Sequence, residues 1–125
     1  MIFGIGTDIV AVARLRAMWE RHGDKAVERI LASQEISDFN GAADKGRFLA
    51  KRFAAKEAFS KALGTGVRPP ASLSAIAVQH DDLGKPVFGF SAALCALLEE
   101  KKLKAHLSIS DEAEYAVAYV ILEQA

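Results

Sequence analysis

The longest helical pattern in this chain is KGRFLAKRFAAKEAFSKAL, residues 45–63, and Gly64 follows it directly. Apolar residues recur at helical spacing along it, and alanine, lysine, arginine and glutamate all favour helices. Glycine is the residue that most readily adopts the left-handed conformation that ends many helices. The sequence therefore predicts one long helix against which the rest of the chain packs.

Four shorter elements precede this helix. Residues 2–10 are mainly apolar and predict a strand, and residues 11–22 carry apolar side chains at helical spacing. Asp24 and Ser33 are residue types that cap helix N-termini, so each predicts a short helix after it. Residues 41–46 predict the loop that leads into the long helix.

Two hairpins and a helix follow the long helix. The expected elements are strands at 73–78 and 86–90, a helix at about 92–102, and strands at 106–110 and 115–122. Because the strands pair as hairpins and do not alternate regularly with helices, we expect an α+β fold with a mainly antiparallel sheet packed on the long helix.

Length and composition indicate a single domain spanning 1–125. The chain has 125 residues, 51% of them hydrophobic, which is enough to bury a core and argues against disorder. Sixteen basic residues balance sixteen acidic ones. A neutral chain exerts no long-range attraction on polyanions, so we expect no nucleic-acid partner, and any electrostatic recognition must be local.

The chain shows no signal for export or for a membrane. Its longest uncharged stretch, 86–98, is shorter than the roughly 18 apolar residues of a membrane span, and residues 1–10 lack a basic leader region. The single cysteine, Cys95, lies in an apolar run and is expected to be a small buried side chain. These features predict a soluble cytoplasmic protein.

The first strand carries a charged residue that needs an explanation. Period 2 places Gly4, Gly6 and Asp8 on one face of the strand. A carboxylate on an apolar strand is costly to bury unless it is paired or binds a cation. Asp8 either caps the helix that starts near Ala11 or belongs to a ligand site, and the bare glycine face favours the ligand site.

The long helix carries a second candidate site. Glu57, Lys61 and Gly64 recur at i, i+4 and i+7, which places a carboxylate, an ammonium and the helix end on one stripe. This stripe is suited to a metal phosphate, although a surface Glu–Lys pair that merely supports the helix has the same spacing.

Cations are concentrated in the same helix. Residues 45–61 contain one acidic residue, Glu57, and six basic residues: Lys45, Arg47, Lys51, Arg52, Lys56 and Lys61. The alternatives are a solvated helix face and a phosphate-binding surface, and phosphate binding explains the excess of one sign more simply.

Several familiar catalytic patterns are absent. The run from Gly4 has Ile9 where the third glycine of GxGxxG belongs, and the run from Gly64 lacks the GK[ST] ending of a phosphate-binding loop. No serine lies in a GxSxG turn, and no cysteine and histidine spacing fits zinc. The sequence therefore offers no nucleophile of its own.

A second basic excess lies in the first helix and its exit. Four cations, Arg14, Arg16, Arg21 and Lys25, outnumber Glu20 and Asp24. They are either ordinary exposed helix charges or a docking surface, to which Met18 and Trp19 would add apolar contact.

Five segments together resemble the holo-acyl-carrier-protein synthase family of 4′-phosphopantetheinyl transferases. They are GIGTDIV at 4–10, RFLAKRFAAKEA at 47–58, KALGTG at 61–66, GKP at 84–86 and HLSIS at 106–110. The resemblance covers essentially the whole chain. One departure is Asp111, where many family members carry a second histidine.

The resemblance implies an activity that the residues above can serve. Enzymes of this family move the phosphopantetheine arm of coenzyme A onto a serine of an apo acyl carrier protein, in support of fatty acid biosynthesis, and release adenosine 3′,5′-bisphosphate. Asp8 and Glu57 would hold Mg²⁺, or Mn²⁺ in its place, and Lys61 would neutralise the pyrophosphate during catalysis. Serine deprotonation would fall to Glu57 or to a metal-bound water.

The resemblance also implies binding residues and an assembly. Coenzyme A phosphates would contact Lys45, Arg52, Lys61, Gly64 and His106. The carrier protein would dock on Arg14, Met18, Arg21 and Lys25. The family is trimeric, so we expect a homotrimer with its sites between subunits.

Two other functions remain open from the residues. A non-catalytic module could bind coenzyme A or a carrier protein, but it would have no need of both Asp8 and Glu57. A metal-dependent phosphodiesterase would use water as the nucleophile and would typically show more carboxylate or histidine ligands.

Overall fold

The computed structural model describes all 125 residues and confirms the α+β fold. The first half contains β1 (Ile2–Ala11), α1 (Val12–His22), α2 (Asp24–Ile30), α3 (Ile36–Gly41) and α4 (Lys45–Leu63). The second half contains β2 (Ile76–His80), β3 (Pro86–Phe90), α5 (Ala92–Glu100), β4 (Leu103–Asp111) and β5 (Tyr115–Gln124).

Most expected elements are present, with small shifts at their ends. The hairpin strand expected at 73–78 begins only at Ile76, because Leu73–Ala75 forms a short 3₁₀ turn. The strand expected from His106 starts three residues earlier, at Leu103.

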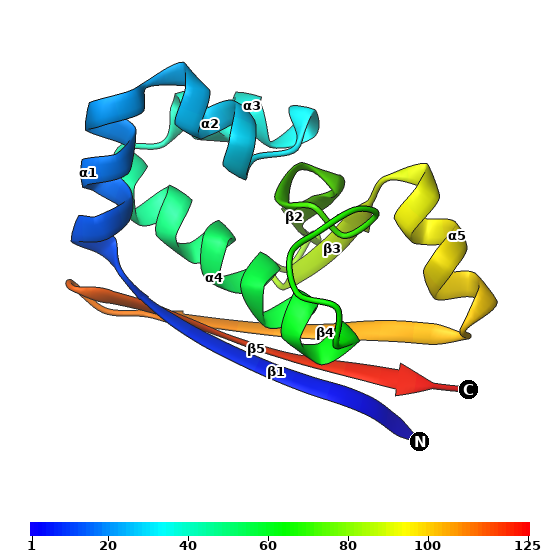
Figure 1. Cartoon of the computed structure of the whole chain (residues 1–125). Helices are drawn as coiled ribbons and strands as arrows, with labels where there is room; N and C mark the ends of the chain where they lie inside the picture. Colours follow the sequence, from blue (N-terminus) through cyan, green and yellow to red (C-terminus); the bar gives the residue numbers. More distant parts are fainter.

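The strands form two antiparallel sheets. The larger has the order β1-β5-β4, and the β2-β3 hairpin forms the smaller one. Helix α4 runs across one face of the larger sheet, and α1, α2 and α3 lie together beyond it (Figure 1). The two chain ends are adjacent, because the Met1 ammonium donates to the Gln124 carbonyl oxygen at 3.0 Å.

Two glycines let β1 approach α4 closely. A Cβ atom built on Gly4 would lie 1.9 Å from the carbonyl oxygen of Ala62, and one on Gly6 would lie 1.9 Å from that of Ala58. No side chain fits at either position. The Gly4 and Gly6 face of the first strand is therefore a helix-packing surface. The interpretation of these glycines as a sign of a ligand site is wrong.

Helix α4 is central to the core. Its buried apolar residues are Leu49, Ala50, Ala54, Ala55, Ala58, Phe59, Ala62 and Leu63. The Phe59 ring packs on Phe88 and Phe90 of β3, with centroids 5.3 and 5.0 Å away. The side chain of Asp44 caps the helix N-terminus, and Gly64 ends it at φ 88°. The sheet and the hairpin are therefore held in place by the same helix.

Cys95 does not occupy the buried position that its apolar neighbours suggested. It is exposed on α5, with its Sγ 3.7 Å from Glu99 Oε1. Leu94 and Leu98 face the core instead, so Cys95 falls on the solvent side of the helix. None of the helices has the length and apolar composition that a bilayer crossing requires.

Candidate active site

Asp8 and Lys61 meet where β1 passes beside α4. Lys61 Nζ lies 3.2 Å from Asp8 Oδ1 and donates to the Thr7 carbonyl oxygen at 2.9 Å. The Asp8 side chain is largely buried, with 16% exposed, whereas that of Lys61 is half exposed. One lysine thus joins the helix to the strand and offers its charge at the surface.

Glu57 lies one turn before Lys61 on α4 and is electrostatically coupled to Asp8. Burial raises the pKa of Glu57, and the negative charge of Asp8 raises it further. The cationic Lys61 and Arg14 act in the opposite direction. Two carboxylates from separate elements therefore repel each other across a partly buried site.

This pair of carboxylates fits a magnesium ion shared with substrate. Mg²⁺ is commonly bound through one or two carboxylates, with waters and substrate phosphates completing its shell. The chain has no cluster of three or more histidine, cysteine, aspartate or glutamate side chains that could form a complete protein cage. A divalent cation at Asp8 and Glu57 would also relieve the repulsion between them.

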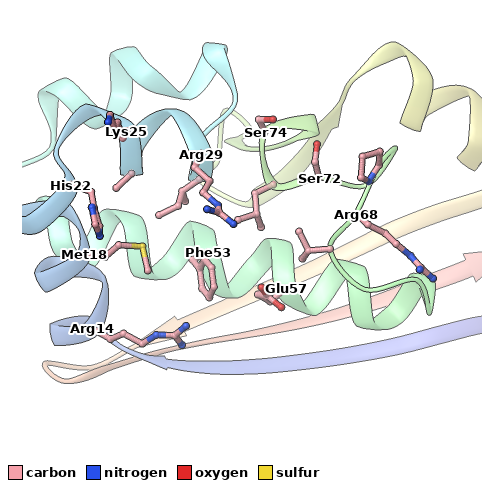
Figure 2. A pocket seen from close by; sticks show the side chains of 15 residues that line it. Arg14, Met18, His22, Lys25, Arg29, Phe53, Glu57, Arg68, Ser72 and Ser74 are labelled. Atoms are coloured by element: carbon pink, nitrogen blue, oxygen red, sulfur yellow. The ribbon is translucent and has the colours of Figure 1, made fainter.

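A groove opens from Glu57 toward the N-terminal helices. Its volume is about 960 Å³, and its walls come from α1 and α2 on one side and from residues 67–74 on the other (Figure 2). Phe53 and Glu57 of α4 form its floor. The candidate metal ligand is therefore reached through an open space larger than a single side chain.

Three of the four predicted docking residues line this groove. They are Arg14, Met18 and Lys25, and the guanidinium of Arg14 lies 5.5 Å from the Phe53 ring centre. Arg21 is exposed but does not line the groove. The structure thus brings most of the predicted docking surface to the same space as Glu57.

The predicted phosphate contacts divide into two groups. Lys61 and Gly64 lie at the C-terminal end of α4, and of the two Lys61 contacts Asp8. Lys45 begins the same helix, about 24 Å away along its axis at 1.5 Å per residue. Its ammonium donates to the Ala42 carbonyl oxygen at 2.9 Å. Within one chain, Lys45 does not reach the Asp8–Glu57 site.

Arg52 is also not at this site. Its side chain is 4% exposed, and its Nε lies 3.0 Å from Glu35 Oε2, inside the molecule. Its guanidinium stacks over the ring of Phe48, 4.0 Å from the centroid. Because its charge is already paired with a buried carboxylate, Arg52 is not free to bind a phosphate, and we leave it out of the proposed contacts.

Glu35 is the important residue that sequence reasoning missed. It also forms a buried ion pair with Lys56 and accepts hydrogen bonds from the Ala32 and Val78 amides at 2.8 and 2.9 Å. Burial lowers the pKa of Lys56 to about 8. Arg52 and Lys56 are four residues apart and share one helix face. That spacing was the available signal for a common acidic partner.

His106 lies on the other face of the sheet. It is exposed on β4, while its neighbour Leu107 is buried, and its Nε2 lies 3.0 Å from Glu123 Oε1. This hydrogen bond lowers the pKa of Glu123. At the end of the same strand, Asp111 pairs with Arg47 at 2.9 Å. Asp111, which stands where many family members carry a second histidine, therefore forms an ion pair within this chain.

Comparison with known proteins identifies the family of the chain. The model of the 4′-phosphopantetheinyl transferase superfamily matches residues 4–120. A holo-[acyl-carrier-protein] synthase of Dechloromonas aromatica is 75% identical over 125 residues, covering 100% of both chains.

Solved structures show the same likeness. The crystal structure of holo-[acyl-carrier-protein] synthase from Neisseria meningitidis has a TM-score of 0.95 and 45% identity, covering 99% of this chain and 100% of that one. The Bacillus anthracis enzyme, solved in complex with CoA (3′,5′-ADP), has a TM-score of 0.84 and 42% identity, covering 100% and 99%. The chain belongs to the 4′-phosphopantetheinyl transferase superfamily.

Proposed function

We propose that this enzyme transfers the 4′-phosphopantetheine group of coenzyme A to a serine of an apo acyl carrier protein and releases adenosine 3′,5′-bisphosphate. The observation that carries the proposal is the grouping of Asp8, Glu57 and Lys61, of which Glu57 lines an open groove. Support comes from the relatives named holo-[acyl-carrier-protein] synthase and from the relative solved with CoA (3′,5′-ADP). The product carrier serves fatty acid biosynthesis.

The carboxylates of Asp8 and Glu57 would hold Mg²⁺, or Mn²⁺ in its place. When bound, the ion supplies charge stabilisation to the pyrophosphate as a Lewis acid. The ammonium of Lys61, which is half exposed and already oriented by Asp8 and Thr7, places a further positive charge beside the same phosphates. The departing adenosine bisphosphate is thereby neutralised as its charge develops.

The acceptor serine enters through the groove. Its oxygen forms a bond to the phosphorus that bears the pantetheine arm, and the bond from that phosphorus to the bridging oxygen of the pyrophosphate breaks. The serine proton would pass to the Glu57 carboxylate or to a water. Arg14, Met18, Arg21 and Lys25 provide the carrier's docking surface along α1 and the start of α2.

The assembly is a homotrimer with sites between subunits. The outer face of the larger sheet leaves Ile5 57%, Ile9 63%, Tyr115 49% and Tyr119 43% exposed. An apolar face of this kind is typical of a surface that another chain covers. Since Lys45 and His106 do not reach the Asp8–Glu57 site of their own chain, they contact the coenzyme A bound at a neighbouring one. Light scattering on the purified protein tests the assembly.

The proposed location is the reducing cytoplasm. The single cysteine has no intrachain partner with which to form a disulfide, so the fold does not depend on an oxidising compartment. Co-fractionation of the untagged protein with a cytoplasmic marker tests the location.

Intact-mass spectrometry of the carrier tests the activity directly. Apo acyl carrier protein, coenzyme A, Mg²⁺ and this protein are incubated together, and the carrier is expected to gain one phosphopantetheine group. A carrier whose serine is replaced by alanine is the matched control and should gain nothing. Binding of coenzyme A without a mass change would favour a non-catalytic module, and hydrolysis of coenzyme A without transfer would favour a phosphodiesterase.

A further inference from the structure

The buried carboxylate of Glu35 joins three separate parts of the chain. Glu35 ends the short 3₁₀ turn Ser33–Glu35, which lies between α2 and α3, and only 1% of it is exposed. Its partners are the amides of Ala32 and Val78 and the side chains of Arg52 and Lys56. One side chain therefore connects the turn after α2, strand β2 and helix α4.

Lys56 is the member of this cluster that lies beside the candidate active site in the sequence. It is fully buried and, besides pairing with Glu35, donates to the carbonyl oxygen of Ile30 at the end of α2, 2.7 Å away. Ile30 lines the groove, and so does Glu57, the residue that follows Lys56. The Lys56 side chain therefore ties one wall of the groove to the turn of α4 that carries Glu57.

Helix geometry links the direction of Lys56 to that of Glu57. Successive residues of an α-helix point about 100° apart, so fixing the direction of one side chain fixes that of the next. On the other side of Glu57, the carbonyl oxygen of Ala58 packs against β1 so closely that a Cβ on Gly6 would lie 1.9 Å from it. Glu57 thus lies between two anchored residues, one held by Glu35 and one by the strand that carries Asp8.

The charges of the cluster do not balance. Glu35 is one carboxylate, whereas Arg52 and Lys56 are two cations, and all three are almost completely buried. Asp38, the other acid near Arg52, is 68% exposed and 3.8 Å away. Burying a surplus charge is unfavourable, and Glu35 with Arg52 alone would form a neutral pair. Stability therefore does not account for the presence of Lys56.

We infer that Glu35, acting through Lys56, is a positioning residue that directs the Glu57 carboxylate toward Asp8 and the cation they share. The inference rests on the proposed function, which assigns a divalent cation to Asp8 and Glu57. Glu35 and Lys56 are buried and do not line the groove, so they act by orienting α4 and not by touching substrate. Partners of this kind, one layer behind a metal ligand, commonly tune metal affinity and activity.

Lys56→Met tests the inference because it removes the link to Glu57 and leaves Glu35 paired with Arg52. Magnesium affinity, measured by calorimetry, and kcat should each fall about tenfold. The KM for the carrier should stay within about twofold, since the docking residues on α1 are unchanged. The sign of the change is informative, because loss of a nearby cation would by itself strengthen the binding of Mg²⁺. The melting temperature should stay within a few degrees of the parent's.

Two further variants separate positioning from stability. Glu35→Gln keeps the size of the side chain but removes its charge, so it should lower both the magnesium affinity and the melting temperature. Leu98→Ala is the matched control, because Leu98 is buried on α5 and does not line the groove. It should lower the melting temperature by creating a cavity, while its magnesium affinity and kcat stay within about twofold of the parent's.

Each alternative result has a definite meaning. Unchanged or increased magnesium affinity in folded Lys56→Met overturns the inference, and so does an equal loss in Leu98→Ala. Circular dichroism checks folding, and Glu35→Gln decides the matter if Lys56→Met does not fold. A parent protein that binds no magnesium overturns the metal assignment of Asp8 and Glu57 and this inference with it. A parent that binds magnesium but leaves the carrier unmodified refutes the proposed transfer, which is a separate result.

Discussion

Lys61 bridges α4 and β1 by holding its ammonium 3.2 Å from Asp8 Oδ1 and donating to the neighbouring Thr7 carbonyl oxygen. The contact links residues that are more than fifty positions apart in the sequence. It places a cation beside one of two mutually repelling carboxylates and leaves much of that cation exposed to a phosphate. The proposed chemistry depends on this arrangement.

Removing either carboxylate should abolish transfer while the protein stays folded. Asp8→Ala and Glu57→Ala each leave the proposed metal site with one carboxylate ligand in place of two, so we expect turnover to fall by at least ~10²-fold. Mass spectrometry of the carrier measures transfer, and thermal melting checks the fold. Chelation of divalent cations should have the same effect on the parent. Turnover within a few-fold of the parent in either folded variant would remove that residue from the metal site.

Lys61→Ala should weaken coenzyme A binding and slow the chemical step. Loss of a cation that stabilises developing phosphate charge is expected to lower the rate by ~10²-fold. Calorimetry measures the affinity, and single-turnover kinetics measure the step. Lys101→Ala removes an equal charge outside the site and should change neither. Unchanged affinity and rate in Lys61→Ala would remove this end of α4 from the donor site.

Glu35→Ala should be strongly destabilising. The substitution leaves Arg52 and Lys56 buried without their shared carboxylate, and breaking a buried pair of this kind costs about 3–5 kcal/mol. Asp38→Ala is the control, because Asp38 is exposed and its oxygen lies 3.8 Å from Arg52. Loss of such an exposed partner should cost less than about 1 kcal/mol in urea denaturation. Equal costs for the two variants would contradict the buried network.

As the pH is lowered, magnesium affinity should begin to fall at a higher pH than it would if Glu57 had the pKa of an ordinary glutamate. The pKa of Glu57 in the metal-free protein is raised by burial and by Asp8, and the ion binds only the deprotonated carboxylate. As pH falls through this raised pKa, a proton competes with the ion. In Asp8→Asn the pKa of Glu57 should be lower, which carbon-detected NMR of the carboxyl measures. A Glu57 pKa that does not fall in this variant would refute the coupling.

Gly6→Ala should destabilise the contact between β1 and α4. Its new Cβ would lie 1.9 Å from the Ala58 carbonyl oxygen, so the strand or the helix must move. Such overpacking costs about 1–3 kcal/mol. Gly41→Ala is a matched control because no atom lies within 4 Å of its built Cβ. Thermal melts that shift equally for both variants would show that the close approach is unimportant.

Local pattern was sufficient to predict the elements and the fold class. Helical spacing followed by Gly64 identified α4, and turn residues between apolar runs identified the hairpins, because both signals act over a few neighbouring residues. The family motifs also singled out Asp8, Glu57 and Lys61, which the structure brings together. Asp8 lies in β1, and Glu57 and Lys61 lie in the last turns of α4. Local sequence patterns predict both of these elements.

Long-range packing settled the remaining questions. The sequence predicts Arg52 to be a free cation, but in the structure Glu35 neutralises it. The position of Glu35 relative to α4 is set by the packing of the folded core. The glycine face of β1 looked like a ligand site because the helix that covers it lies far along the chain. The groove likewise needs α1, α2, α4 and the following loop to enclose it. Burial and pairing depend on which distant surfaces meet, and neither residue type nor spacing encodes that directly.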